Sequence, residues 1–209
     1  MHRTILVASA CSLALAAAQG CGSSSNPRAT SNGGAAAAGG STKSEPANAL
    51  SAEAQSAATG DIPDNQIFLT YHSSSPRYSM LYPEGWALKG AGADATIAEK
   101  NNIVHVLVTT AAAPTAASLS SELSALKRSN PSLTFTAPVA VQLKTGLAIR
   151  ATYTTRSAPN PVTGKSVLLV VDRYELSKGG LRATVDLGTP SGVDNVDAYR
   201  KMINSFNWQ

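Results

Sequence analysis

The side chains of this 209-residue sequence that are best able to form covalent bonds are its two cysteines, Cys11 and Cys21. A cysteine sulfur is a nucleophile that can accept an acyl or alkyl group. Cys11 lies inside an uncharged and mostly apolar stretch, Thr4 to Ala18, close to the start of the chain. Cys21 comes shortly after that stretch ends. We therefore expect covalent modification at Cys21 rather than at Cys11.

The stretch before Cys21 has the features of an export signal. It follows a short segment with one firm positive charge, Arg3, and carries no charge itself. At ~1.5 Å per residue a helix of this length would span roughly 22 Å, less than the ~30 Å hydrocarbon core of a bilayer. Residues 1–20 are therefore predicted to be a cleaved signal peptide rather than a stable transmembrane anchor.

The run Ala18-Gln19-Gly20-Cys21 resembles the lipobox, the cleavage and lipidation motif of exported lipoproteins. Leucine is usual in that motif where this chain has Ala18. The resemblance implies cleavage before Cys21 and lipid on its sulfur; the alternative is an ordinary cleavage site at which Cys21 stays unmodified. Two or three acyl chains anchor a protein stably, so the expected location is the extracytoplasmic face of the cell membrane. With its only remaining cysteine carrying the lipid, the mature chain could form no internal disulfide.

The composition of the chain changes near residue 60. Gly22 to Gly60 has no aromatic residue and a single leucine, Leu50. Such a segment cannot bury enough apolar surface to offset its ordering entropy. Residues 21–60 are therefore predicted to be a lipidated cysteine and a flexible tether with a reach of roughly 35 Å. All aromatic residues lie in 61–209, which is predicted to be one globular domain.

The run Gly164-Lys165-Ser166 invites comparison with a phosphate-binding loop. That motif needs a glycine five positions before Gly164, where this chain has Pro159. It also needs a turn from a strand into a helix, whose backbone N–H groups face the phosphates. Strands are predicted on both sides here. We therefore interpret Ser157 to Lys165 as a hairpin loop.

Metal binding, catalysis and nucleic-acid binding find little support in the sequence. His72 and His105 lie on different predicted strands, with no second ligand at the spacing of a metal site. No Gly-x-Ser-x-Gly run marks a serine nucleophile. The formal net charge of +4 is small and scattered, which argues against a nucleic-acid partner. We therefore expect no metal, no cofactor and no enzymatic activity.

Three further side chains of the predicted domain have expected roles in packing or binding. Asp172 interrupts a run of apolar residues, and we expect it to form a cross-strand ion pair with Arg150 or Arg182. The alternative is that Asp172 lines a ligand cleft. Trp86 follows a tight turn and is expected to fill the edge of the core. Trp208, near the terminus, is expected to lie exposed and to contact a partner or a lipid headgroup.

The pattern of apolar residues predicts an α+β fold, with an antiparallel sheet flanked by helices. Helices are expected over Ser118 to Ser129 and from near Asp194 to the end, with one apolar stripe formed by Val196, Tyr199, Ile203 and Phe206. The run from Val167 to Val171 is expected to be a central strand buried on both faces. Strands are predicted over residues 67–71, 78–82, 86–89, 95–100, 103–109, 139–143, 147–154, 166–176 and 181–187.

Residues 78–86 resemble the start of a known family. Their sequence, Tyr-Ser-Met-Leu-Tyr-Pro-Glu-Gly-Trp, is similar to the aromatic strand and Pro-x-Gly-Trp turn that open PsbP-like domains. Within that group the chain most resembles the LpqN-like lipoproteins of actinobacteria, whose closing helix often ends in Ser-Phe, as at Ser205-Phe206 here. The resemblance implies a PsbP-like sandwich and a generally non-enzymatic role, and it carries over no functional residue.

The sequence therefore favours a membrane-anchored binding or adaptor module that recruits an envelope protein. The alternative is a carrier of a small apolar or lipid ligand, held between sheet and helix. A pocket lined by apolar side chains would favour the carrier, whereas a packed sheet with an exposed apolar patch would favour the adaptor.

Overall fold

The computed structural model describes residues 60–160 and 164–209. The expectations for residues 1–59, including the signal peptide, the lipidation of Cys21 and the tether, lie outside the described residues. The domain boundary expected at residue 61 stays a prediction.

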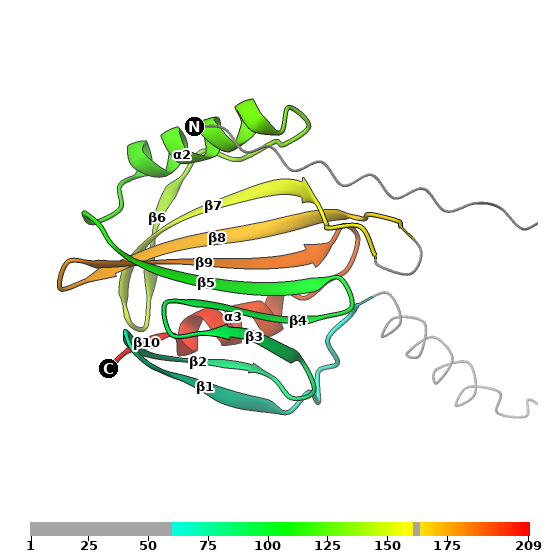
Figure 1. Ribbon diagram of the computed structural model, residues 1–209, viewed down its shortest axis with the longest axis horizontal. Helices are drawn as coiled ribbons and strands as arrows, with labels where there is room; N and C mark the ends of the chain where they lie inside the picture. The colour runs from blue at the N-terminus through cyan, green and yellow to red at the C-terminus, as the bar shows by residue number, and fades with distance from the viewer. Residues whose placement is uncertain (1–59, 161–163) are drawn as a thin grey trace, which may run out of the picture. The chain divides into compact units, whose positions relative to one another are not determined.

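The strands form two antiparallel sheets (Figure 1). The smaller sheet has the strand order β1–β2–β10, and the larger has the order β3–β4–β5–β9–β8–β7–β6. The smaller sheet consists of β1 (Phe68–Ser74), β2 (Arg77–Pro83) and β10 (Asn207–Trp208). The larger sheet consists of β3 (Ala87–Ala91), β4 (Asp94–Glu99), β5 (Asn102–Thr110), β6 (Val139–Leu143), β7 (Gly146–Arg156), β8 (Leu168–Lys178) and β9 (Leu181–Pro190).

Two described helices cover opposite faces of the larger sheet: α2 (Ala116–Ser129) lies over β7 and β8, and α3 (Val196–Ser205) lies on the other side, against β2. The predicted α+β class, with antiparallel strands and flanking helices, is confirmed. The division into two sheets was not expected. The pairing of β10 with β2, more than a hundred residues earlier, was not expected either, because the sequence does not show it.

Helix α2 begins and ends close to where the sequence predicted. The side chain of Thr115 accepts a hydrogen bond from the backbone N–H of Ser118, and the side chain of Ser118 accepts one from the backbone N–H of Thr115, which caps the first turn. Leu119 and Leu123 are fully buried against β7 and β8. Helix α2 therefore covers its face of the sheet with two leucines rather than with a longer stripe.

Helix α3 differs from the predicted stripe at its first residue. Tyr199 and Ile203 are buried as expected, but Val196 is 59% exposed and Met202 is buried instead. Phe206 is buried just beyond the end of the helix. Val196 is exposed because it is the first helical residue, at the mouth of a hollow that the helix does not fill.

Strand β8 was expected to be buried on both faces, and this prediction is wrong. Leu169 and Val171 are buried beneath α2, but Leu168 is 45% exposed and Val170 is only half-buried. Alternate residues of a strand point to opposite faces, and the face opposite α2 is hollow beside Val170. Strand β8 is central in the sheet but is covered fully on one side only.

A row of aromatic rings joins the smaller sheet to the end of α3. Tyr78 stacks on Phe206 with ring centroids 5.5 Å apart, and Phe206 meets the edge of Trp208 at 5.2 Å. Trp208 is only 8% exposed, so its expected exposure is wrong, since β10 adds it to β2 and turns it into the core. Trp86 is buried as predicted.

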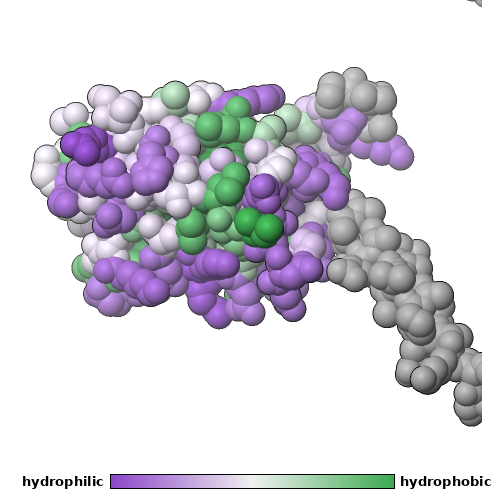
Figure 2. All heavy atoms as spheres, turned by 90° about the horizontal axis from the view of Figure 1, so that it is seen from below, coloured by the Kyte–Doolittle hydropathy of each residue, from purple (hydrophilic) through white to green (hydrophobic). Residues whose placement is uncertain are grey.

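The surface that carries the smaller sheet has an apolar stripe. Figure 2 shows the face that lies at the bottom of Figure 1, where β1 and β2 are found. Hydrophobic side chains form a central band on this face, with hydrophilic side chains on either side. Ile67, just before β1, is 61% exposed, and Leu69 on β1 is 40% exposed. Apolar side chains at the start of β1 therefore face solvent.

Candidate functional site: a pocket between the larger sheet and helix α3

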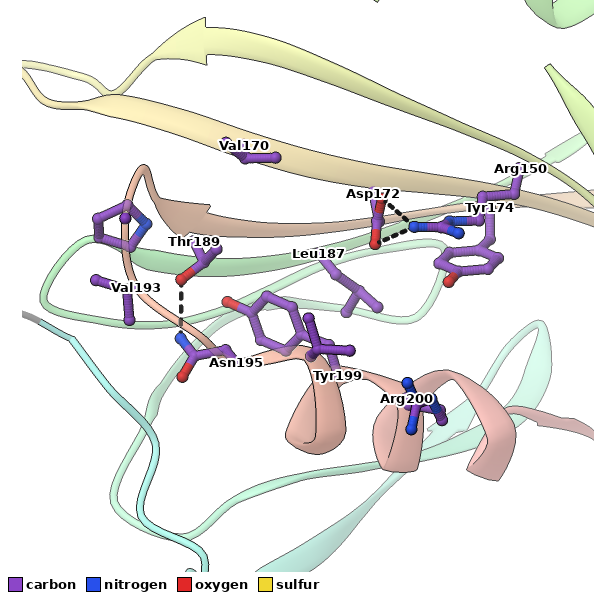
Figure 3. A pocket seen from close by; sticks show the side chains of 13 residues that line it. Arg150, Val170, Asp172, Tyr174, Leu187, Thr189, Val193, Asn195, Tyr199 and Arg200 are labelled. Carbon is purple, nitrogen blue, oxygen red and sulfur yellow. Dashed lines mark hydrogen bonds and ion pairs between the residues drawn. The ribbon is translucent and has the colours of Figure 1, made fainter. Parts of the chain in front are cut away.

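A pocket of about 270 Å³ lies between β8, β9 and the N-terminal half of α3 (Figure 3). It occupies the hollow opposite α2, where the sheet and α3 diverge. Its lining comes from β7, β8, β9, the segment after β9, and α3. The lining residues are Arg150, Val170, Asp172, Tyr174, Leu187, Thr189, Pro190, Gly192, Val193, Asn195, Val196, Tyr199 and Arg200.

The alternation of β8 places three side chains in the pocket. Val170, Asp172 and Tyr174 point away from α2, and Leu187 of β9 is paired in register with Asp172. Val193 closes the same end as Val170 (Figure 3). The end of the pocket near Val170 and Val193 is thus lined by apolar side chains beside Thr189 and Asn195, which are hydrogen-bonded to each other, and the lining becomes charged along β8 towards Tyr174.

The ion pair of Asp172 confirms one of the two predicted partners. Nη2 of Arg150 donates to both carboxylate oxygens of Asp172 at 2.9 Å. The hydroxyl of Thr152 donates to the same carboxylate at 2.6 Å. Asp172 also lines the pocket, so the alternative expectation, that it lines a ligand cleft, stays a prediction. Arg182 lies elsewhere, 2.9 Å from Glu122 of α2.

The electrostatics at this end of the pocket keep Arg150 and Tyr174 protonated. Burial lowers the pKa of Arg150, but the hydrogen bond and the charge of Asp172 outweigh burial, so that pKa is raised above its ordinary value. Burial raises the pKa of the Tyr174 hydroxyl, and the charge of Arg150 only partly opposes this. The Arg150 guanidinium lies 5.7 Å from the centre of the Tyr174 ring. This end therefore presents fixed hydrogen-bond donors at neutral pH.

A second polar group, Asn195, closes the opposite end and is 3% exposed. Its amide nitrogen donates to the backbone oxygen of Gly60 at 3.0 Å, to the Thr189 hydroxyl at 2.8 Å and to Asn102 at 3.1 Å. Its oxygen accepts from the backbone N–H of Ile62 at 2.8 Å. Asn195 thus joins the first described residues of the chain to the pocket wall.

Tyr199 forms the floor of the pocket on α3. Its hydroxyl donates to the backbone oxygen of Gly188 at 2.6 Å, and burial raises its pKa. A tyrosine whose hydroxyl is bonded in this way presents only its ring to the pocket. The floor is therefore apolar and held in place.

The other residues singled out in the sequence do not meet at this pocket. The two histidines lie in different sheets. Nε2 of His105 on β5 lies 2.9 Å from Oδ1 of Asp94, and Nδ1 of His72 on β1 lies 3.4 Å from Nε2 of Gln209. Over residues 60–160 and 164–209, no three side chains of His, Cys, Asp or Glu are grouped to hold a metal ion.

The loop interpretation of the Gly164-Lys165-Ser166 run is confirmed for its described residues. The run lies between β7 and β8, and backbone bonds from Asn160 to Lys165 and from Gly164 to Asn160 fold it back on itself. No helix follows it, so it has no helix N-terminus to face a phosphate. Within the described part of the chain, no helix is both long and apolar enough to cross a membrane.

Sequence reasoning missed most of the pocket. The alternation of Val170, Asp172 and Tyr174 was the available signal, because it places a charge and a phenol on one face of an otherwise apolar strand. Asn195 and Arg200 had no such signal, since their role depends on where α3 lies against the sheet.

Comparisons with known proteins give weak similarities. No family model and no curated protein matches the chain. Among solved structures, cyanobacterial PsbP from Synechocystis is 15% identical, with a TM-score of 0.48, over 72% of this chain and 98% of that one. The yeast Ran-binding protein Mog1p from Saccharomyces cerevisiae is 7% identical, with a TM-score of 0.45, over 69% of this chain and 96% of that one.

A third structure, from Bacteroides thetaiotaomicron, is 14% identical, with a TM-score of 0.42, over 67% of this chain and 48% of that one. The resemblance to PsbP-like domains inferred from the sequence therefore stays a resemblance. A closer relation to LpqN-like lipoproteins stays a prediction.

Proposed function

We propose that the domain is a non-enzymatic binding module and that the pocket between β8, β9 and α3 binds a small ligand. The observation that carries this proposal is the construction of the pocket walls. Tyr199 and Asn195 are held by hydrogen bonds to the protein, and Arg150 and Asp172 are held by each other. Walls fixed before binding reduce the entropy lost when a ligand is bound.

The size and lining of the pocket support the carrier alternative. Typical small-molecule pockets hold roughly 300–1,000 Å³ and combine apolar walls with a few polar groups that orient the ligand. A pocket of about 270 Å³ suits a ligand at or below the small end of that range. A bilayer lipid is too large to be enclosed, so we propose a smaller molecule.

An adaptor role remains the second candidate. The exposed apolar side chains of Ile67 and Leu69 favour it, because apolar patches on protein surfaces often mark binding sites. The two roles are compatible, since the smaller sheet and the pocket are built from different strands.

Anchoring through lipid on Cys21 forms part of the proposal. Confinement beside a membrane raises the effective concentration of a module for partners in the same layer. A ligand that itself gathers at the membrane could then occupy a pocket of modest affinity at a low concentration in bulk solution. The proposed partners are therefore the membrane, through the lipid, and a small ligand or an envelope protein.

Filling the pocket tests its proposed role. Val170→Trp should occupy the apolar end, and Val139→Trp on β6, where the side chain is exposed, is the matched control. We expect the full chain and the control variant to bind eight-carbon alkyl compounds in isothermal titration calorimetry. Val170→Trp should lose that binding while keeping its circular dichroism spectrum. Equal binding by Val170→Trp would show that the ligand sits elsewhere, and absence of binding in all three proteins would refute the role of the pocket.

A further inference from the structure

The distribution of charge in the pocket points to a ligand class. We infer that the pocket takes an amphipathic anion: a short hydrocarbon portion that ends in a carboxylate or another singly charged acid. This inference rests on the proposed function and names the chemistry that the same site would select. Its grounds are an excess of hydrogen-bond donors at one end of the pocket and apolar walls at the other.

Positive groups outnumber negative ones in the lining. Arg150 and Arg200 contribute two guanidinium groups, and Asp172 contributes the single carboxylate. Asp172 already accepts two hydrogen bonds from Arg150 and one from the Thr152 hydroxyl. Most of its capacity to accept further hydrogen bonds is therefore filled, and a ligand cation would find little left to bind.

The donors of the two arginines are less completely used. Arg150 bonds Asp172 through Nη2 alone, and its Nε is buried without a hydrogen-bond partner among the described residues. Arg200 is paired through Nη1 with Asp197. The side chain of Arg200 is 64% exposed and that of Asp197 is 87% exposed. An exposed pair of this kind contributes little, so the Arg200 side chain can turn towards an anion at low cost.

The side chain of Tyr174 lies between the two arginines. In Figure 3 its ring lies beneath the Arg150 guanidinium, and its hydroxyl points into the space on the side of Arg200. Because its pKa is raised by burial, the hydroxyl keeps its proton and can donate. Once turned inward, the Arg200 guanidinium would join Arg150 and the Tyr174 phenol around one position, an arrangement that suits a carboxylate.

The other half of the pocket suits a hydrocarbon chain. Val170 and Val193 lie at the end away from the arginines in Figure 3, with Leu187 between the two ends. The ring of Tyr199 forms the floor. A chain of a few methylene groups lying along Leu187 would be removed from water, which favours binding, while its acid group reached Tyr174.

Three eight-carbon probes separate charge from apolar content. Calorimetric titration of the full chain with octanoate, octanol and octylammonium should give an affinity for octanoate about tenfold above that for octanol, because hydrogen bonds to a charged group are stronger than those to a neutral one. Octylammonium should bind more weakly than octanol. Equal affinities for octanoate and octanol would overturn the anion class while leaving the binding role of the pocket intact. Tighter binding of octylammonium would also overturn it and would make Asp172 the recognition group.

Two variants test the assigned groups directly. Arg200→Gln and Tyr174→Phe should each lower the affinity for octanoate several-fold and leave that for octanol unchanged. Arg128→Gln, an exposed arginine on α2, is the control and should change neither. If Arg200→Gln left octanoate binding unchanged, or weakened octanol binding as much, the assignment of the anion to this end of the pocket would fail. If none of the three probes bound the unmodified chain, the proposed function itself would fail.

Discussion

The carboxylate of Glu175 lies 3.8 Å from the guanidinium of Arg182, and the Glu175 side chain has no exposed surface. The same guanidinium nitrogen lies 2.9 Å from Glu122 of α2, so two carboxylates share one positive charge. Neither oxygen of Glu175 has a hydrogen-bond partner among the described residues. Burial, followed by the charge of Glu122, raises the pKa of Glu175 from 4.5 to about 7.

This raised pKa predicts that the domain loses stability as the pH rises towards neutrality. Between the unfolded pKa of 4.5 and the folded pKa of about 7, the folded state binds more protons than the unfolded state. The free energy of unfolding therefore falls with rising pH across that window. Glu175→Gln should remove most of this slope and should stabilise the domain at pH 8, by on the order of 1–3 kcal/mol.

Urea denaturation at pH 5 and pH 8 measures the effect of Glu175→Gln. Glu84→Gln, at an exposed carboxylate, is the control, and its free energy of unfolding should change between pH 5 and pH 8 as much as that of the unmodified protein. An unchanged slope in Glu175→Gln would mean that Glu175 is ionised in the fold at pH 5.

A second charged pair on the same face of the larger sheet should tolerate little change. Arg173 and Asp186 are paired at 2.8 and 2.6 Å, with side-chain exposures of 14% and 10%. Asp186→Ala leaves the Arg173 charge buried and unpaired, which should cost about 3–5 kcal/mol. Arg173→Met combined with Asp186→Leu should recover much of that loss. The exposed pair of Arg200 and Asp197 is the control, and Asp197→Ala should lower the free energy of unfolding by at most about 1 kcal/mol. If Asp186→Ala and Asp197→Ala lowered it by similar amounts, burial would not be what makes the pair of Arg173 and Asp186 important.

The buried amide of Asn195 should contribute strongly to stability. Asn195→Ala removes its bonds to Gly60, Ile62 and Thr189 and leaves the buried backbone N–H of Ile62 unpaired, while the oxygen of Gly60 keeps its bond from the Asn102 amide; the expected cost is about 1–3 kcal/mol. Thermal denaturation followed by circular dichroism measures the loss. Asn207→Ala, at an exposed asparagine, should leave the melting temperature almost unchanged. A melting temperature of Asn195→Ala equal to that of the control would mean that water replaces the amide without loss.

The last strand should be a structural element rather than a loose end. Trp208→Ala removes one ring of the row that joins Tyr78 and Phe206, and we expect a cost of about 3–5 kcal/mol. Trp208→Phe keeps an aromatic edge at the same place and should cost less. Denaturation curves of the two variants decide this, and near-neutral values for both would place Trp208 in solvent.

Anchoring is tested at Cys21, which lies outside the described residues. Cys21→Ser should abolish the incorporation of radiolabelled palmitate and leave the protein uncleaved or released from the membrane. Cys11→Ser is the matched control and should label as the unmodified chain does. Persistent labelling of Cys21→Ser would disprove the lipobox interpretation.

Features that depend on neighbouring strands could be predicted from the sequence. The pairing of Asp172 with Arg150 follows from two consecutive strands joined by one loop, because the alternation of each strand fixes which side chains share a face. The helix expected over Ser118 to Ser129 was found at α2 for a similar reason, since a helical repeat is local.

Features that depend on distant segments could not be predicted. Trp208 is buried because β10 pairs with β2, and nothing near residue 208 indicates that partner. Val196 fits the apolar repeat of α3 but lies at the mouth of the pocket. The pocket itself exists because α3 diverges from the sheet beside Val170, and the direction of a helix against a sheet is set by packing across the whole domain.

The bonds of Asn195 to Gly60 and Ile62 also have a mechanical consequence. They are among the first hydrogen bonds that tie the described chain to the fold, so a pull from the N-terminal side loads them before it shears either sheet. Asn195 directly precedes α3 and lines the pocket, so the load reaches the pocket wall first. A ligand bound against this wall would therefore raise the force needed to unfold the domain.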